Sequence, residues 1–148
     1  MEWGLYVNLA HIQMLTDPFT PMGCSLFRAV THLSEKYLLY LNGFVFINIA
    51  GGIRVTDLAM DLSVIAAVLS SNVDTAIEQG WCMAGEVGLS GEVRPVNRME
   101  QRLAEAEKLG FTDIVIPRYN MQRIDKSKYN INLHPVRKVE EALRILFG

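Results

Sequence analysis

One stretch constrains the fold of this chain more than any other: residues 84–111, AGEVGLSGEVRPVNRMEQRLAEAEKLGF. It repeats Gly-Glu-Val within nine residues and continues directly into a charged helical pattern. Residues 81–87 and 92–96 are short extended runs, and the four residues Gly88–Gly91 between them match a common hairpin connection. We therefore predict an antiparallel hairpin that leads straight into a helix.

The helix after this hairpin is predicted from Arg98 to Leu109, with Asn97 as its N-cap and Gly110 in the left-handed conformation at its end. Its inward side chains would be Met99, Leu103 and Ala106. The glycines lead into a strand rather than a helix N-terminus, and the sequence has no G-x-x-x-x-G-K-[ST] motif. This pattern excludes a P-loop ATPase.

Apolar patterns predict the remaining elements. A helix over residues 58–71, capped by Thr56 or Asp57, would be the central buried one, with a stripe made of Leu58, Leu62, Ile65, Ala66 and Leu69. Strands are expected at 5–12, 44–50, 114–116 and 131–133, and further helices at 26–41 and 136–147. Because strands and helices do not alternate strictly, we expect an α+β or irregular α/β fold with two layers.

Length and composition favour a single cytoplasmic domain. The chain has 148 residues, half of them hydrophobic, which is close to the usual domain size. No run of about 18 uncharged apolar residues predicts a membrane span, and residues 1–25 lack a signal-peptide pattern. Cys24 and Cys82 lie too far apart for a zinc ribbon, so we expect two buried thiols.

Charge is distributed unevenly along the chain. Residues 1–93 contain three Lys/Arg and nine Asp/Glu, a balance of −6, whereas residues 94–148 contain eleven and seven, a balance of +4. A polyanion would therefore bind the second part. The alternative is that these basic residues, which are interleaved with acids, are ordinary solvated helix faces.

No catalytic or metal-binding motif stands out. Glu86 and Glu92 could form a carboxylate pair, but hairpin register alone would also place them near each other. The histidines lack metal-ligand spacing, and the aromatic residues lack the repeated spacing of a stacking surface: His11, His32 and His134, and Trp3, Trp81, Tyr119 and Tyr129. We expect structural roles for these side chains, and no metal or cofactor.

A family resemblance runs through residues 48–71, 84–111 and 114–117, and the closing helical pattern at 136–147 shares it. These segments strongly resemble the C-terminal Lon-protease-like domain of the bacterial DNA repair family RadA, also called Sms. The resemblance implies a Lon proteolytic-domain-like fold, similar to the ribosomal-protein domain-2-like superfold. Within one domain, residues 44–148 would be its core and residues 1–43 a divergent N-terminal part.

The resemblance also implies that no protease dyad is present. Met60 occupies the position of the Lon serine nucleophile, and Arg102 occupies that of the lysine base. A thioether has no proton to lose, and a guanidinium cannot accept one at accessible pH. A displaced pair, Ser63 with Lys108, is the only other candidate for a dyad.

What the resemblance implies for function is a scaffold role in DNA repair and recombination. In that family the domain helps to assemble a hexameric ring and contributes to DNA binding, alongside zinc and ATPase parts whose motifs this sequence lacks; a full-length member would be a DNA-dependent ATPase. The DNA, single-stranded or branched, would meet Arg94, Arg98, Arg102 and Lys108.

Two other functions remain open. One is a Ser-Lys peptidase on the Lon fold. The other is the Lon-like domain of a ComM or magnesium-chelatase-type ATPase, which shares the glycine-rich hairpin, although the run Arg98–Arg102 favours RadA.

Overall fold

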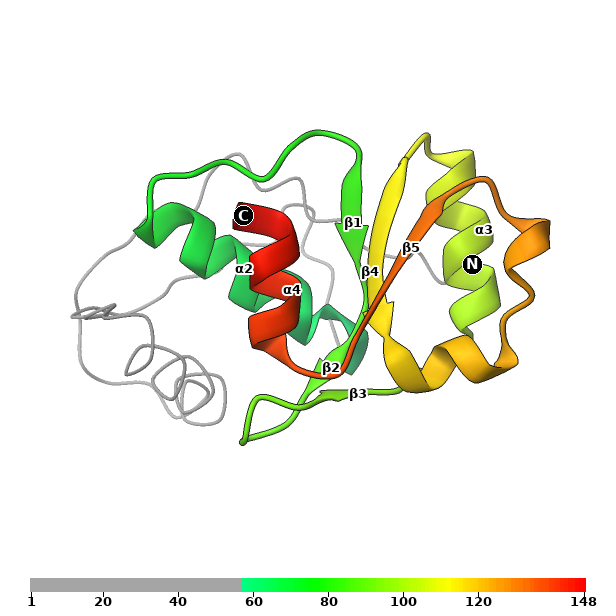
Figure 1. Cartoon of the computed structure of the whole chain (residues 1–148), viewed down its shortest axis with the longest axis horizontal. Coiled ribbons are helices and arrows are strands. Elements are labelled where there is room, and N and C mark those ends of the chain that lie inside the picture. Colours follow the sequence, from blue (N-terminus) through cyan, green and yellow to red (C-terminus); the bar gives the residue numbers. More distant parts are fainter. Residues whose placement is uncertain (1–56) are drawn as a thin grey trace.

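The structure, a computed structural model, describes residues 57–148 (Figure 1). The predicted elements at 5–12, 26–41 and 44–50 lie outside these residues, as does Thr56. In chain order the described elements are η2 (Leu58–Met60), α2 (Asp61–Asn72), β1 (Trp81–Met83), β2 (Glu86–Val87), β3 (Val93–Arg94), α3 (Met99–Lys108), β4 (Asp113–Pro117), η3 (Arg118–Arg123), η4 (Lys126–Lys128), β5 (Asn132–Val136) and α4 (Val139–Phe147).

Two sheets organise the described residues. Three parallel strands form the larger sheet in the order β1-β4-β5, in a register that aligns Trp81, Asp113 and Asn132. The predicted hairpin forms the smaller sheet, in which β2 and β3 are antiparallel and Val87 pairs with Val93. The extended run 81–87 is therefore divided between two sheets: β1 pairs with β4, and β2 pairs with β3.

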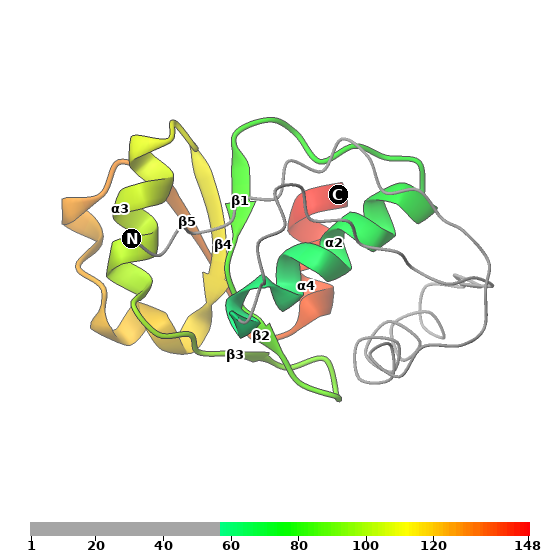
Figure 2. The same ribbon diagram turned by 180° about the vertical axis from the view of Figure 1, so that it is seen from behind.

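Helices cover both faces of the parallel sheet, as Figures 1 and 2 show from opposite sides. On one face, α2 and α4 pack against Val115 and Val136; on the other, α3 packs against Cys82 and Ile114. The mixed class is confirmed, but the prediction of two layers is wrong for the described residues. Parallel strands need a crossover connection, and the crossover from β1 to β4 carries α3 onto the second face.

The predicted central helix is buried as expected, with a different first residue. Asp57 caps its first turn, η2, by accepting a hydrogen bond from the backbone N–H of Ala59 (3.0 Å). Leu62 and Ile65 are fully buried, whereas Leu58, which was predicted to begin the apolar stripe, is 59% exposed and does not belong to it. The stripe therefore begins one turn later than the sequence pattern indicates.

The boundaries of three predicted elements need correction. Helix α3 begins at Met99 and its N-cap is Arg98, which has φ +56° and makes no side-chain capping bond, so Asn97 is not the cap. Helix α4 begins at Val139, because Val136 pairs with Pro117 as the last residue of β5. Strand β5 consequently covers 132–136 rather than 131–133. The left-handed glycine after α3 is confirmed, with φ +86° at Gly110.

Candidate functional site

The start of α2 is joined to the hairpin by backbone hydrogen bonds around Gly85. The N–H of Gly85 donates to the carbonyl of Ala59 (2.8 Å), and the N–H of Leu62 donates to the carbonyl of Gly85 (3.1 Å). The second bond satisfies an N–H that has no partner inside the helix. A side chain at Gly85 would not fit, because a Cβ there would lie 2.8 Å from Cγ1 of Val93. The position of Met60, one residue before α2, is therefore fixed against the hairpin.

The carboxylate of Asp61 ties the same junction. Its Oδ2 accepts a hydrogen bond from the N–H of Val87 (3.2 Å). Partial burial raises the pKa of Asp61, and the bond from Val87 only partly offsets that effect. Because its carboxylate accepts a hydrogen bond from the backbone of Val87, Asp61 links α2 to β2.

The structure brings Arg102 close to the turn that contains Met60. Its Nη2 atom lies 2.5 Å from Oδ2 of Asp57, and its Nε donates to the carbonyl of Asn97 (3.2 Å). Burial opposes ionisation of Asp57, but the hydrogen bonds from Arg102 and from the N–H of Ala59 outweigh burial and lower its pKa. Arg102 therefore contacts the segment that contains Met60, the other predicted dyad position. It does so through an ion pair with Asp57, whereas a dyad would need a neutral base.

The displaced pair, Ser63 with Lys108, is not brought together. The Ser63 hydroxyl is buried and donates to the carbonyl of Met83 (3.2 Å). Lys108 is exposed, with its Nζ 4.0 Å from a carboxylate oxygen of Glu105. Their helices, α2 and α3, lie on opposite sides of the parallel sheet (Figure 1). This arrangement gives Ser63 no lysine base.

Glu86 and Glu92, the two hairpin carboxylates, both form ion pairs with Arg94. Arg94 lies 2.6 Å from Oε1 of Glu92 and 3.3 Å from Oε1 of Glu86. The hydroxyl of Ser90 also donates to Glu92 (2.5 Å). This bond, followed by a backbone hydrogen bond and then by the bonds from Arg94, lowers the pKa of Glu92 to about 2. Glu92 is therefore ionised at neutral pH and cannot serve as a general acid.

The depressed pKa of Glu92 gives a testable prediction. A carboxylate with a lowered folded-state pKa contributes stability above its unfolded pKa, about 4.5, and loses it as pH falls through about 2. We expect an NMR titration of the Glu92 side-chain carboxyl to show this low value, and Ser90→Ala to raise it more than Arg94→Ala does. If the pKa of Glu92 changed negligibly in both variants, hydrogen bonding would not be the cause of its low value.

The four predicted DNA contacts do not form one uncompensated basic face. Arg94, Arg98 and Lys108 are exposed, whereas Arg102 is half-buried. Arg94, Arg102 and Lys108 each have a carboxylate partner. Arg98 lies at the start of α3 in the left-handed conformation. The face is a network of paired charges, and its capacity to attract phosphate is correspondingly reduced.

Sequence reasoning missed a polar cluster on β4 and β5. Oδ1 of Asp113 lies 2.8 Å from Nε2 of His134 and accepts a bond from Nδ2 of Asn132 (3.1 Å), while Oδ2 accepts from the Thr112 hydroxyl (2.8 Å). The His134 ring stacks on Trp81 with centroids 4.6 Å apart. The hydrogen bond with His134 is the largest cause of the lowered pKa of Asp113. No spacing in the sequence reveals this cluster, because only strand register assembles it.

Residues 57–148 offer neither a membrane-spanning helix nor a metal-binding cluster. None of the helices in this part of the chain is long and apolar enough to cross a membrane. Among the same residues, no group of three or more His, Cys, Asp or Glu side chains is placed to hold a metal ion.

Comparison with known protein families now places the chain. Residues 28–120 match the family model described as ChlI, subunit ChlI of Mg-chelatase, and this match covers more than half of the chain. The chain belongs to the ChlI family. The matched region includes the start of α2, the hairpin and α3, which together form the junction described above.

Curated relatives of this ChlI-family chain are RadA proteins. It is 42% identical over 111 residues to the DNA repair protein RadA of Bacillus subtilis, an alignment that covers 75% of this chain and 24% of the relative. It is 40% identical to RadA of Streptococcus pneumoniae over 95% of this chain and 36% of the relative. It is 36% identical to RadA of Aquifex aeolicus over 91% of this chain and 29% of the relative.

The resemblance to RadA predicted from the sequence is confirmed by these matches. The chain spans about a quarter to a third of the length of the RadA proteins that it matches. The activity of the full-length RadA proteins can therefore be assigned to this chain only as a proposal.

Proposed function

We propose that this chain is a non-catalytic Lon-like scaffold module of a RadA-type DNA repair and recombination protein in the cytoplasm, which contributes to homo-oligomeric ring assembly and to DNA binding. The similarity to proteins named DNA repair protein RadA, at 36–42% identity over most of the chain, carries this proposal. The expected partners are other copies of the chain, in a hexameric ring, and single-stranded or branched DNA.

The absence of peptidase chemistry is the first part of the proposal. Met60 and Arg102 stand at the two dyad positions, and Arg102 is engaged with Asp57. Neither side chain can supply an activated nucleophile or a neutral base. A role in assembly and binding, without a cofactor, fits these residues better than hydrolysis does.

The assembly role is supported by exposed apolar side chains. Leu58, Leu89 and Leu109 are each more than half exposed. Apolar side chains that remain in water in one copy are candidates for burial against another. The proposal is that some of these leucines contact the next copy in a ring.

The DNA-binding role was predicted to use Arg94, Arg98, Arg102 and Lys108 on β3 and α3. Binding through such residues releases counterions from the phosphates, so affinity should fall steeply with salt and depend little on sequence. Arg98 and Lys108 are exposed and offer the best positions for testing this face. Substituting Arg102 would also remove the ion pair with Asp57, which would confuse binding with stability.

We expect the purified chain to bind fluorescent single-stranded and branched DNA in a salt-sensitive way, and to do so as an oligomer. The variant Arg98→Glu/Lys108→Glu should bind more weakly if the β3–α3 face carries the site. Arg144→Glu, an exposed charge reversal on α4, is a control for charge change away from this face, with half the change in net charge. Fluorescence anisotropy across a salt series, with light scattering on the same samples, measures both properties. A monomer without affinity for DNA would contradict the proposal.

A magnesium-chelatase-type or ComM-type ATPase module is the second candidate, because the matching family model is that of the Mg-chelatase subunit ChlI. The same experiment separates the two functions. An oligomer that lacks DNA affinity at every salt concentration would favour the chelatase-type module over the RadA-type one.

A further inference from the structure

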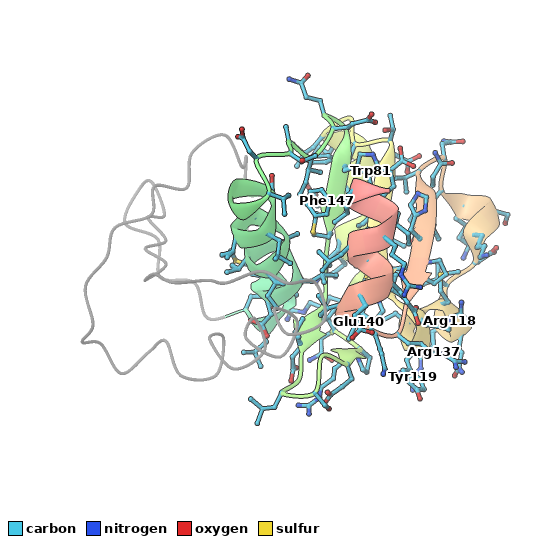
Figure 3. All side chains as sticks on the ribbon, turned by 60° about the vertical axis from the view of Figure 1, so that its left-hand side comes forward. Trp81, Arg118, Tyr119, Arg137, Glu140 and Phe147 are labelled. Atoms are coloured by element: carbon cyan, nitrogen blue, oxygen red, sulfur yellow. The ribbon has the colours of Figure 1, made fainter. Side chains whose placement is uncertain are left out.

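Two arginines emerge together from the carboxyl ends of neighbouring strands. Pro117 and Val136 are the last paired residues of β4 and β5, and Arg118 and Arg137 follow them directly. Paired parallel strands lie about 4.8 Å apart, so the two residues leave the sheet side by side. Figure 3 shows their side chains close together at this edge, with Tyr119 beside them. We call Arg118, Tyr119 and Arg137 the β4–β5 surface.

The backbone beneath the β4–β5 surface is held by hydrogen bonds to the hairpin and its connection. Asn120, the next residue after Tyr119, accepts from the N–H of Val96 (3.0 Å) and donates to the carbonyl of Val96 (2.9 Å). The carbonyl of Arg137 accepts from the N–H of Val93 (2.7 Å). A surface whose backbone is already ordered loses little entropy when it binds a ligand.

The side chains of the β4–β5 surface are directed to solvent. Tyr119 is 62% exposed, and Arg118 and Arg137 are also exposed. Within residues 57–148, neither arginine side chain forms an ion pair, whereas Arg94, Arg102 and Lys108 each contact a carboxylate. An exposed tyrosine beside two arginines combines a stacking face with two phosphate ligands.

The sequence segment that carries the β4–β5 surface has more net positive charge than the segment of the predicted β3–α3 face. Residues 118–141 contain six Lys/Arg and three Asp/Glu, a balance of +3, and residues 94–108 contain four and three, a balance of +1. Glu140 lies beside the arginines in Figure 3, and a carboxylate oxygen of Glu141 accepts from the N–H of Arg137 (2.9 Å). These acids offset part of the positive charge of the two arginines.

We infer that the β4–β5 surface binds a single strand of nucleic acid, with phosphates on Arg118 and Arg137 and an unstacked base on Tyr119. This inference rests on the DNA-binding part of the proposed function and assigns it to a different site. Ligands of open parallel sheets commonly bind outside the carboxyl ends of the strands, and this surface lies at those ends of β4 and β5.

The test compares two charge-matched double variants of the full chain. Fluorescence anisotropy would measure binding of a labelled oligothymidine of about 16 nucleotides, the upper end of common site sizes for strand-binding modules, across a salt series. Arg118→Glu/Arg137→Glu is expected to weaken binding by tenfold or more and to reduce the slope of log affinity against log salt by about 2. Arg98→Glu/Lys108→Glu changes net charge equally and should have the smaller effect.

Variants of Tyr119 test base stacking, which does not depend on the charge of the surface. Tyr119→Ala should weaken oligothymidine binding by about fivefold or more, because stacking on one base is lost, while Tyr119→Phe should retain affinity. Binding of a blunt duplex, whose bases are already stacked, should be unaffected by either change. Circular dichroism and thermal unfolding of each variant would confirm that the fold is intact.

The outcomes separate this inference from the proposed function. If the wild-type chain binds oligothymidine and Arg118→Glu/Arg137→Glu binds equally well, the inference is overturned. The DNA-binding site would then lie on another surface of the chain. Equal loss in Tyr119→Ala for single strand and duplex would overturn the stacking role. A wild-type chain without measurable affinity for oligothymidine at any salt concentration would overturn both the inference and the DNA-binding part of the proposed function.

Discussion

Replacing Leu62 with alanine is expected to lower the free energy of unfolding by about 2–5 kcal/mol, the usual cost of deleting a large aliphatic side chain from a packed core. Leu62 is fully buried in the core that α2 and α4 form with the parallel sheet. Its side chain also reaches the hairpin, where Cδ2 would lie 3.3 Å from a Cβ at Gly85. Truncation therefore opens a cavity at the junction of α2 with the hairpin.

The matched control for this variant is Leu58→Ala, one helical turn earlier in the adjoining η2 turn. Leu58 is 59% exposed, so the same truncation should change stability by less than about 0.5 kcal/mol. Urea unfolding followed by circular dichroism would measure both variants, with protein concentration held constant because self-association shifts apparent stability. Similar losses in the two variants would contradict the assigned packing of α2.

Replacing Gly85 with alanine is expected to destabilise the fold by about 1–3 kcal/mol, the range typical of an overpacked core. Gly85 is buried where the start of α2 meets the hairpin, and an added Cβ would lie 2.8 Å from Cγ1 of Val93. Neighbouring hydrogen bonds from Gly85 to Ala59 and from Leu62 to Gly85 restrict any adjustment of the backbone. At a site with room for the Cβ, Gly→Ala would instead stabilise the protein by about 0.4–1 kcal/mol, because it lowers the conformational entropy of the unfolded chain.

A double-mutant cycle with Val93→Ala isolates this steric contact. Val93 is buried, so its truncation alone should destabilise the protein, but it also removes the methyl group that Gly85→Ala would approach. The double variant should then be more stable than the sum of the single effects by about 0.5–3 kcal/mol. Strict additivity of the two free-energy changes would show that the cost at Gly85 has another origin.

The sequence-based predictions that held rest on short-range signals. Glycine spacing predicted the hairpin between β2 and β3, and Gly110 ends α3 in the left-handed conformation as expected. Three apolar residues at helical spacing correctly predicted the buried side of α3: Met99, Leu103 and Ala106. The errors concerned element ends, where a strand pairing at Val136 overrode a helical pattern and Arg98 took the cap position expected for Asn97.

The candidate site was predicted less completely than the fold. The assignment of Met60 and Arg102 to the dyad positions came from the family resemblance and stays a prediction. The partners of the basic residues could not be predicted, because Asp57 lies 45 residues before Arg102 in the chain. A list of basic residues predicted a DNA face without showing that carboxylates already occupy much of it.

What the sequence by itself determined is the local structure: a glycine-bounded hairpin and helices with one apolar side. What only the tertiary structure decided is which distant residues meet. Strand register places Asp113 against His134 and Arg118 beside Arg137. Each such pairing depends on how strands β4 and β5 align, although the paired residues lie 21 or fewer positions apart in the chain. Local periodicity contains no information about that alignment, because the alignment arises from the burial of both sheet faces by the three helices α2, α3 and α4.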